Sequence, residues 1–273
     1  MICPRCRRLI NAGEKHCPFC GLASPASSWK KYIFALKMDD GSNLITWIIR
    51  VNLALFALSL FIDPRSMGMS YNPLHMLSPS NRSLILLGAT GAIPIDTYGR
   101  WWSLLTASFL HGGILHVGFN MLAFYQIGIL ASRIYGPFRM VLIYLGSGIC
   151  GFVASYLSGV PLTIGASAAI CGLIGATLYY GRSRGGIWGQ AIWRQIGGWA
   201  LGIFAFGLLV PGIDNWAHIG GMLSGALIGW MVGYEEKSKS SAVHRALAMG
   251  GILATGLALA WAVASALYLM LAT

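Results

Sequence analysis

The sequence predicts an all-α polytopic membrane protein with a small module ahead of its first membrane span. Charged residues make up only 10% of the 273 residues, and mean hydropathy is +0.66. A soluble domain has about 25% charged residues. Seven apolar runs fit membrane helices, and the 36 glycines fit helices that approach one another closely in a bilayer. These features exclude a cytosolic globular enzyme, a disordered chain and a fibrous repeat.

The chain is strongly basic, with a net charge of +11 and a pI near 9.6. A nucleic-acid-binding protein could have such a charge. Here, however, Lys and Arg gather in short segments between the apolar runs, where they determine topology and attract anionic lipid headgroups. We therefore expect the lipid bilayer as a partner and no nucleic acid.

Residues 1–22 contain four of the six cysteines, in two C-x-x-C pairs separated by ten residues. Two such pairs offer four thiolates to one tetrahedral ion, the donor set of structural zinc. His16 beside the second pair is a further candidate ligand, although four Cys suffice. Two disulfides are the alternative, but we expect no cleavable signal peptide and a reducing cytosol. The expected ligands of this zinc-ribbon-like module, whose partner is unknown, are Cys3, Cys6, Cys17 and Cys20.

Residues 23–43 separate this module from the first span. Lys30, Lys31 and Lys37 alternate there with aromatic and aliphatic residues, as in segments that lie in a membrane interface. An ordinary linker beside a membrane has the same composition. Both interpretations stay open.

Seven spans are expected, because a run of roughly 20 apolar residues crosses a bilayer. They lie at 44–62, 103–131, 138–158, 167–181, 192–210, 215–234 and 246–271. The fourth run is notably short. Residues 63–102 contain several prolines, and we expect a long loop there.

The distribution of basic residues predicts the orientation. Sixteen Lys and Arg residues fall on one side of the predicted membrane and three on the other. The positive-inside rule places the basic side, with the N-terminus, in the cytoplasm. The 63–102 loop is then outside and, with seven spans, so is the C-terminus. Because no transit or signal sequence is recognised, we expect a prokaryotic inner (cell) membrane.

Polar side chains inside the predicted spans mark a candidate site, since such groups are costly in a bilayer. Ser167 falls in the first turn of the fourth span, and His218 lies about one turn into the sixth. A serine is a poor nucleophile until a base takes its proton, and histidine is the side chain best suited to that task. Asp214 lies near the start of the sixth span and fits a helix cap. We therefore expect a Ser–His dyad without a buried acid.

An acyl-transfer reaction also needs hydrogen-bond donors for its oxyanion. His111, His116 and Asn120 are expected within the second span, the last two on one helix face. The backbone amide of Ser167 is a further donor. Stripes of small residues on the fourth and sixth spans predict the close helix approach that a direct Ser–His hydrogen bond requires. Their members are Ala168, Gly172 and Ala176, and Gly221, Gly225, Gly229 and Gly233.

These segments resemble the rhomboid family of intramembrane serine proteases. The matching motifs, in family order, are HGGILHVGFN at 111–120, GASAAICG at 165–172 and AHIGGMLSG at 217–225. The resemblance covers roughly residues 44–234 and implies a six-helix rhomboid-like core. Residues 235–273 would then form a cytoplasmic loop and an additional seventh helix.

The resemblance implies that Ser167 is the nucleophile and His218 the general base. It also implies that His116 and Asn120 line the oxyanion hole and that His111 supports them. Substrates would be membrane-anchored proteins, cut in or near a transmembrane helix, and catalysis would need no cofactor.

Two further segments also resemble parts of the rhomboid fold. The fifth span and the loop near 210–214 resemble its lateral gate and cap.

The sequence departs from the family pattern at Ala168, where Gly is common, and at Cys171, where an aromatic residue often stacks on the base. It departs also at Ser103, where Arg often follows a Trp pair. None of these departures removes a reacting group.

Two other functional classes stay open. A non-catalytic rhomboid-like protein would bind or escort transmembrane clients, but such proteins usually lack the Ser or the His. A transporter would use His111, His116 and His218 as a proton path. It would be expected to have inverted repeats and acidic residues near span centres, and the sequence has neither. A serine-directed activity probe separates these classes.

Overall fold

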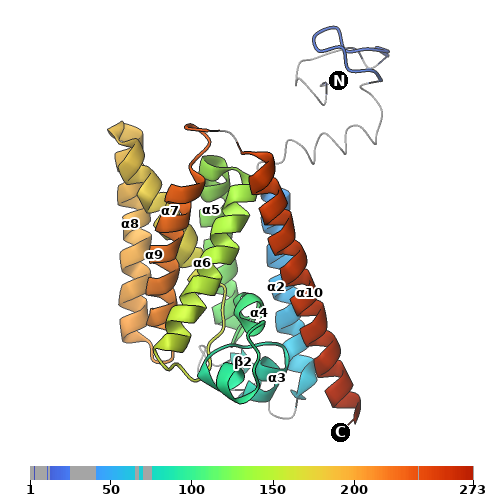
Figure 1. The fold of residues 1–273 in the computed structure, drawn as a ribbon, viewed down its shortest axis with the longest axis vertical. Helices are drawn as coiled ribbons and strands as arrows, with labels where there is room; N and C mark the ends of the chain where they lie inside the picture. Colours follow the sequence, from blue (N-terminus) through green and yellow to red (C-terminus); the bar gives the residue numbers. More distant parts are fainter. Residues whose placement is uncertain are drawn as a thin grey trace.

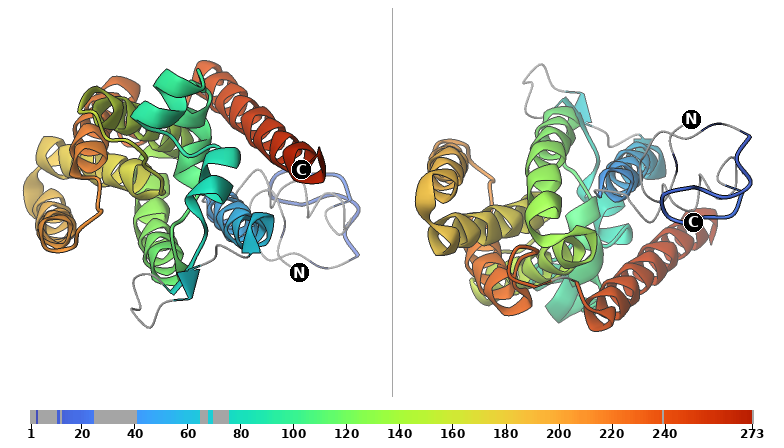
Figure 2. Two further views of the ribbon diagram at one scale, coloured as in Figure 1. Left: turned by 90° about the horizontal axis from the view of Figure 1, so that it is seen from below. Right: turned by 90° about the horizontal axis from the view of Figure 1, so that it is seen from above.

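The computed structural model describes residues 3, 11, 13–24, 41–64, 68–69, 76–238 and 240–272. Its main body is a bundle of long helices that run roughly side by side (Figure 1). α8 and α10 lie on opposite sides of this bundle, as both end-on views show (Figure 2). The long helices are α2 (Ser42–Ile62), α5 (Ile114–Tyr135), α6 (Pro137–Leu157), α7 (Ser167–Arg184), α8 (Gly186–Leu209), α9 (Asn215–Val232) and α10 (Ala242–Ala272).

Five helices of the described chain are long and apolar enough to cross a membrane, namely α2, α5, α6, α8 and α10. α7 and α9 have 18 residues each and are not among these five. α7 is buried along most of its length and packs against α5, α6, α8 and α9. A helix enclosed by others needs no lipid-facing surface, so it can carry small and polar residues. The all-α membrane fold predicted from the sequence is confirmed.

The small-residue stripes bring α7 and α9 into backbone contact. A Cβ atom at Gly221 would overlap the carbonyl group of Ala168, and one at Gly225 would overlap the backbone of Gly172. The close approach predicted for these two helices is therefore confirmed. Gly233 does not belong to the stripe as expected, because it lies beyond the end of α9 with φ of 66° and ends the helix.

The second predicted span is wrong at its start. Residues 103–109 form two short pieces, α4 (Ser103–Thr106) and the 3-10 helix η4 (Ala107–Phe109), and α5 begins only at Ile114. Leu110 is extended, and the following Gly112–Gly113 pair has weak helix propensity. His111 had been expected inside the second span, but it lies in the connection before α5.

The start of the fifth and seventh spans also differs from expectation. α8 begins at Gly186, separated from the end of α7 at Arg184 only by Gly185 with φ of 65°, and α10 begins at Ala242. Arg194 and Arg245, two of the sixteen basic residues assigned to the cytoplasmic side, lie inside these helices.

Residues 76–102 are a compact layer and not the simple loop that the prolines suggested. A short antiparallel hairpin pairs β1 (Gly68–Met69) with β2 (Met76–Ser78). It is followed by α3 (Asn81–Leu86) and the π-helix η3 (Ile93–Thr97). Two hydrogen bonds fasten this layer to α4: Thr106 Oγ1 donates to the Gly88 carbonyl at 2.7 Å, and Ser103 Oγ donates to Thr90 Oγ1 at 2.9 Å.

One buried cation links the start of α6 to the α9–α10 connection and to α10, which also packs against α6, α4, α3 and α2. Arg139 at the start of α6 is fully buried and forms an ion pair with Glu235 at 3.7 Å. Its guanidinium also donates to the Ser238 carbonyl at 2.8 Å and to His244 Nδ1 at 3.3 Å. A buried charge of this kind is stable only when it is paired and hydrogen-bonded. The connection between α9 and α10 is therefore held against the core.

Candidate active site

Ser167 is the first residue of α7 and follows a tightly packed connection. Gly165 adopts φ of 123°, a conformation that side chains rarely tolerate. Its amide donates to the Ala107 carbonyl at 2.9 Å, and a backbone bridge joins Thr163 to Thr90. The layer formed by residues 76–102, together with η4, thus fixes the position from which the Ser167 side chain projects.

His218 lies one turn into α9, on a helix start that is well anchored. The Asp214 side chain caps the helix by accepting from the Ala217 amide at 3.0 Å. The prediction that Asp214 marks the helix start is confirmed. The buried Ser155 hydroxyl of α6 also donates to the Asp214 carboxylate. Ser155 was not predicted from the sequence. The signal that could have indicated it is a hydroxyl residue near the end of an apolar span.

The side chains of Ser167 and His218 meet between α7 and α9. Ser167 Oγ lies 2.9 Å from His218 Nε2, and the histidine is 6% exposed. Within the described residues, His218 Nδ1 is buried without a hydrogen-bond partner, so no carboxylate contacts the second ring nitrogen. The pair can transfer a proton from the hydroxyl to the imidazole in a site that is largely shielded from water.

His116 and Asn120 both lie on α5, on the face that the sequence predicted. The Gly112 amide donates to His116 Nδ1 at 3.2 Å, so a neutral His116 ring carries its proton on Nε2. A Cβ atom at Gly165 would lie 2.8 Å from this Nε2, which places the donor beside the connection that leads to Ser167. Asn120 Nδ2 donates one of its two hydrogens to the His116 carbonyl at 2.9 Å, so the second N–H remains available as a donor.

His111 packs against the ring of His116. The two ring centroids are 5.0 Å apart in an edge-to-face arrangement, and His111 is fully buried. Both ring nitrogens of His111 lack a hydrogen-bond partner among the residues that the structure describes. Its contact with His116 is one that can hold the His116 ring in place.

The three departures from the family pattern are all accommodated by packing. Ala168 is buried, and its carbonyl faces Gly221 of α9. Cys171 is fully buried on α7. Ser103 donates its hydroxyl hydrogen to Thr90, as described above. None of the three positions carries a group that interrupts the contact between Ser167 and His218.

The N-terminal cysteines form a separate cluster. The Sγ atoms of Cys3, Cys17 and Cys20 all lie within 4.8 Å of one another and could hold a metal ion. The Sγ atoms of Cys3 and Cys20 are 3.8 Å apart, well beyond the roughly 2.05 Å of a disulfide bond. Cys6, the fourth expected ligand, lies outside the described residues. His16 takes part in a backbone bridge with Ala23.

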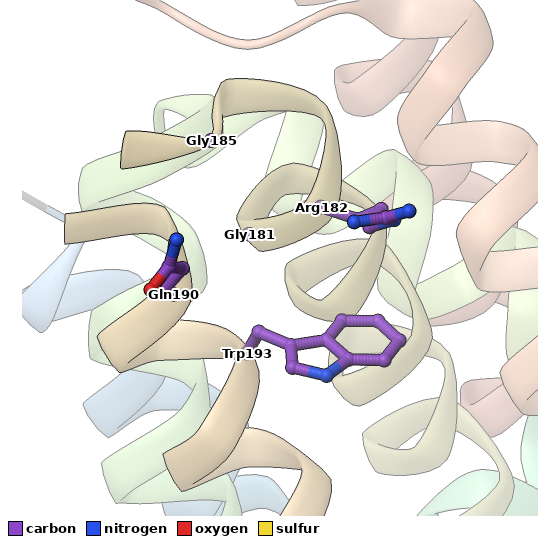
Figure 3. A pocket seen from close by; sticks show the side chains of 5 residues that line it. All are labelled: Gly181, Arg182, Gly185, Gln190 and Trp193. Carbon is purple, nitrogen blue, oxygen red and sulfur yellow. The ribbon is translucent and has the colours of Figure 1, made fainter. Parts of the chain in front are cut away.

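A cavity of about 390 Å³ lies at the other end of α7, between α7 and α8. Figure 3 shows the Arg182, Gln190 and Trp193 side chains around it, with Gly181 and Gly185 completing the lining. Gly181 is fourteen residues after Ser167, which corresponds to about 21 Å along a helix. This cavity is therefore not part of the Ser–His site.

Comparison with known proteins identifies the fold around this site. The family model described as "Rhomboid domain" matches residues 98–235, which is half of the chain. The chain belongs to the rhomboid family. The matched segment runs from α4 to the end of α9 and includes every residue of the candidate site. With its five apolar helices, this rhomboid is an integral membrane protein.

Three relatives illustrate the similarity. The rhomboid protease GluP of Bacillus subtilis (strain 168) is 39% identical over 148 residues, which are 54% of this chain and 29% of that protein. Rhomboid-type serine protease 2 of Emericella nidulans is 36% identical over 139 residues, 49% of this chain and 27% of that protein. Inactive RHOMBOID-like protein 8 of Arabidopsis thaliana is 29% identical over 226 residues, 72% of this chain and 62% of that protein. The chain spans less than two thirds of the length of each.

Proposed function

We propose that this rhomboid is an intramembrane serine endopeptidase that cuts membrane-anchored proteins in or near a transmembrane helix. The observation that carries the proposal is the 2.9 Å contact between Ser167 Oγ and His218 Nε2, made between two helices of a membrane protein. Two of the relatives named above are rhomboid proteases by name. A nucleophile and a base within hydrogen-bond reach are the requirement for acyl transfer.

In the proposed mechanism, His218 Nε2 accepts the proton of Ser167 Oγ while the oxygen attacks the carbonyl carbon of the scissile peptide. The oxyanion that forms takes hydrogen bonds from His116 Nε2–H, the second Asn120 Nδ2–H and the Ser167 amide. The imidazolium then protonates the leaving amine, and the C–N bond breaks. Water, deprotonated by His218, hydrolyses the acyl-enzyme and releases the new carboxylate. No step needs a cofactor.

A helical substrate is proposed to enter beside α8. This helix is attached to α9 through Asn215, whose Nδ2 donates to the Gly207 carbonyl at 2.9 Å. Leu201, Leu208 and Leu209 of α8 are 74–82% exposed, so the outer face of the helix is apolar and open to a lipid or to another helix. This is the segment that resembles the lateral gate of the family.

The orientation expected from the basic residues belongs to the same proposal. We place the N-terminus and the basic connections in the cytoplasm of a prokaryotic cell and the C-terminus outside its inner membrane. The C-terminus lies at the same end of the bundle as α3 and β2 (Figure 1), so residues 76–86 and the C-terminus share one side. Ser167 begins α7 at that same end, and water would reach it from outside.

The alternative function is a non-catalytic rhomboid-like protein that binds transmembrane clients, and one relative named above is called inactive. A serine-directed phosphonate probe distinguishes the two. The protease is expected to be labelled at Ser167, with labelling lost in Ser167→Ala and in His218→Ala. A wild-type protein that binds a transmembrane peptide but takes up no label would support the client-binding alternative instead.

Removing one oxyanion donor is expected to slow turnover without unfolding the protein. Asn120→Ala should lower kcat by about 10²-fold or somewhat less, the scale for losing one donor, while KM changes little. Asn120→Asp serves as the matched variant, because it keeps the size of the side chain and removes the N–H groups. Wild-type kcat in both variants would mean that backbone amides and His116 stabilise the oxyanion without Asn120.

We further propose that the N-terminal cluster holds one structural zinc ion, with Cys6 as the fourth ligand of Cys3, Cys17 and Cys20. Three thiolates within 4.8 Å of one another match the donors that zinc prefers. Metal analysis of the purified protein is expected to find about one zinc per chain. Cys17→Ser should release it, whereas Cys150→Ser, which changes an exposed cysteine of α6, should not. Equal zinc content in wild type and Cys17→Ser would contradict this assignment.

A further inference from the structure

A second cavity, of about 380 Å³, lies on the layer formed by residues 76–102. It is lined by Arg82, Ile85 and Leu86 of α3 and by Tyr98 and Arg100 of the segment that leads to α4. Two guanidinium groups thus share one cavity, and none of these lining residues is acidic. An arrangement of this kind favours an anionic occupant.

The Arg100 side chain is held in place before any ligand arrives. Its Nη1 donates to the Ile85 carbonyl at 2.6 Å. Its guanidinium carbon lies 5.3 Å from the ring centroid of Tyr98 and 5.8 Å from that of Trp102. A guanidinium has five N–H donors, so others remain available to a ligand. Because the side chain is already ordered, binding would cost little further conformational entropy.

Arg82 supplies the second charge. It lies exposed on α3. The ion pairs found in the described part of the chain join Arg139 to Glu235 and Arg184 to Glu236, so neither Arg82 nor Arg100 is neutralised by a carboxylate there. The nearby acid Asp96 instead accepts a hydrogen bond from the Tyr156 hydroxyl at 2.9 Å. Two cations without acidic partners remain at this cavity.

The surroundings of the cavity are apolar and aromatic. Ile85 and Leu86 contribute aliphatic surface to its lining, and Tyr98 and Trp101 are 56% and 55% exposed. Aromatic side chains of this kind concentrate where lipid headgroups meet the acyl chains. A soluble phosphate would gain nothing from the apolar lining, whereas a phospholipid would use both the cations and the apolar surface.

We propose that this cavity binds the phosphate group of an anionic phospholipid, with Arg82 and Arg100 on the phosphate and Ile85 and Leu86 against the glycerol and upper acyl carbons. The site is distinct from the Ser–His pair and does not depend on the proposed proteolysis. Its occupation would stabilise the layer that positions Ser167, because Thr90 of this layer pairs with Thr163 in the connection before α7.

The proposal is tested by lipid binding to the full chain in an uncharged detergent. Phosphatidylglycerol is expected to bind and to raise Tm, and phosphatidylcholine, which has no net charge, is not. Arg82→Gln should weaken phosphatidylglycerol affinity about fivefold, the equivalent of about 1 kcal/mol per basic residue at an anionic lipid surface. Arg133→Gln is the matched control, because it also removes an exposed charge, at the end of α5, and should leave the affinity unchanged.

Three results would overturn the proposal. An equal loss of affinity in Arg82→Gln and Arg133→Gln would mean that only net charge attracts the lipid. Displacement of the lipid by inorganic phosphate or glycerol phosphate at similar concentration would identify a soluble-anion site. Equal binding of phosphatidylglycerol and phosphatidylcholine would show that the site does not select a lipid with a net negative charge. Because each measurement reports binding or Tm, none depends on whether the protein cleaves a substrate.

Discussion

Ser167→Ala is expected to lower cleavage of a transmembrane model substrate by about 10⁴- to 10⁶-fold, and His218→Ala by a similar factor. The two side chains act as one unit, because the proton that leaves Ser167 Oγ is taken by His218 Nε2 at 2.9 Å. Combining the two substitutions should therefore cost little more than either alone. Initial rates on a fluorescent transmembrane peptide, in detergent and in vesicles, measure the effect.

Ser224→Ala provides the matched control for this prediction. The Ser224 hydroxyl on α9 donates to the Gly220 carbonyl at 2.6 Å within its own helix, so its loss should leave turnover near wild type. Unchanged Tm in Ser167→Ala would show that the lost activity is not lost folding. If Ser167→Ala retains activity that Cys171→Ala then removes, the buried thiol one turn further along α7 is the nucleophile, and the assignment of Ser167 is wrong.

Gly225→Ala is expected to have the largest effect on stability. Its new Cβ would overlap the backbone of Gly172 on α7, and backbone atoms cannot move aside as a flexible side chain can. Overpacking of this kind costs about 1–3 kcal/mol. Because α7 and α9 carry Ser167 and His218, forcing these helices apart should also lengthen the Ser–His contact and reduce activity. Thermal unfolding in detergent and initial rates measure the two effects.

Gly202→Ala tests whether the loss comes from helix contact or from the substitution itself. Gly202 lies on α8, and no heavy atom would meet its new Cβ within 4 Å. Alanine is favoured over glycine in a helix interior by about 1 kcal/mol, so this variant should be as stable as wild type or slightly more stable. A drop in Tm of equal size in both variants would contradict the packing explanation.

The sequence was sufficient for the helices, their order and the site hypothesis. Apolar runs and breakers are local properties, so the seven long helices could be found without tertiary information. The stripes of small residues at Ala168–Gly172–Ala176 and Gly221–Gly225–Gly229 predicted which helices touch, because only small residues permit backbone contact. This contact placed Ser167 and His218 together, and the structure shows their side chains 2.9 Å apart.

Other features depend on residues that are far apart in the chain. The break between His111 and Ile114 follows the layer of residues 76–102, α4 and η4, which lie before α5 at the end of the bundle. Hydropathy averaged along the sequence does not detect this break, because it merges α4, η4 and α5 into one long apolar run. The contact of Ser155 with Asp214 joins α6 to α9. The contacts of Arg139 with Glu235 and His244 join the start of α6 to α10 across about a hundred residues of sequence.

The sequence by itself determined the all-α membrane fold, its rhomboid motifs and the residue types of the candidate site. Hydropathy and small-residue spacing indicate these properties, because the underlying interactions act within one helix or between two regular helices. Only the tertiary structure decided that His116 presents Nε2 toward the Gly165 connection, since Gly112 occupies its Nδ1. It also decided that Arg82 and Arg100 share a cavity. Side-chain hydrogen bonds and cavities form only where separate segments meet, and no local pattern in the chain specifies where that occurs.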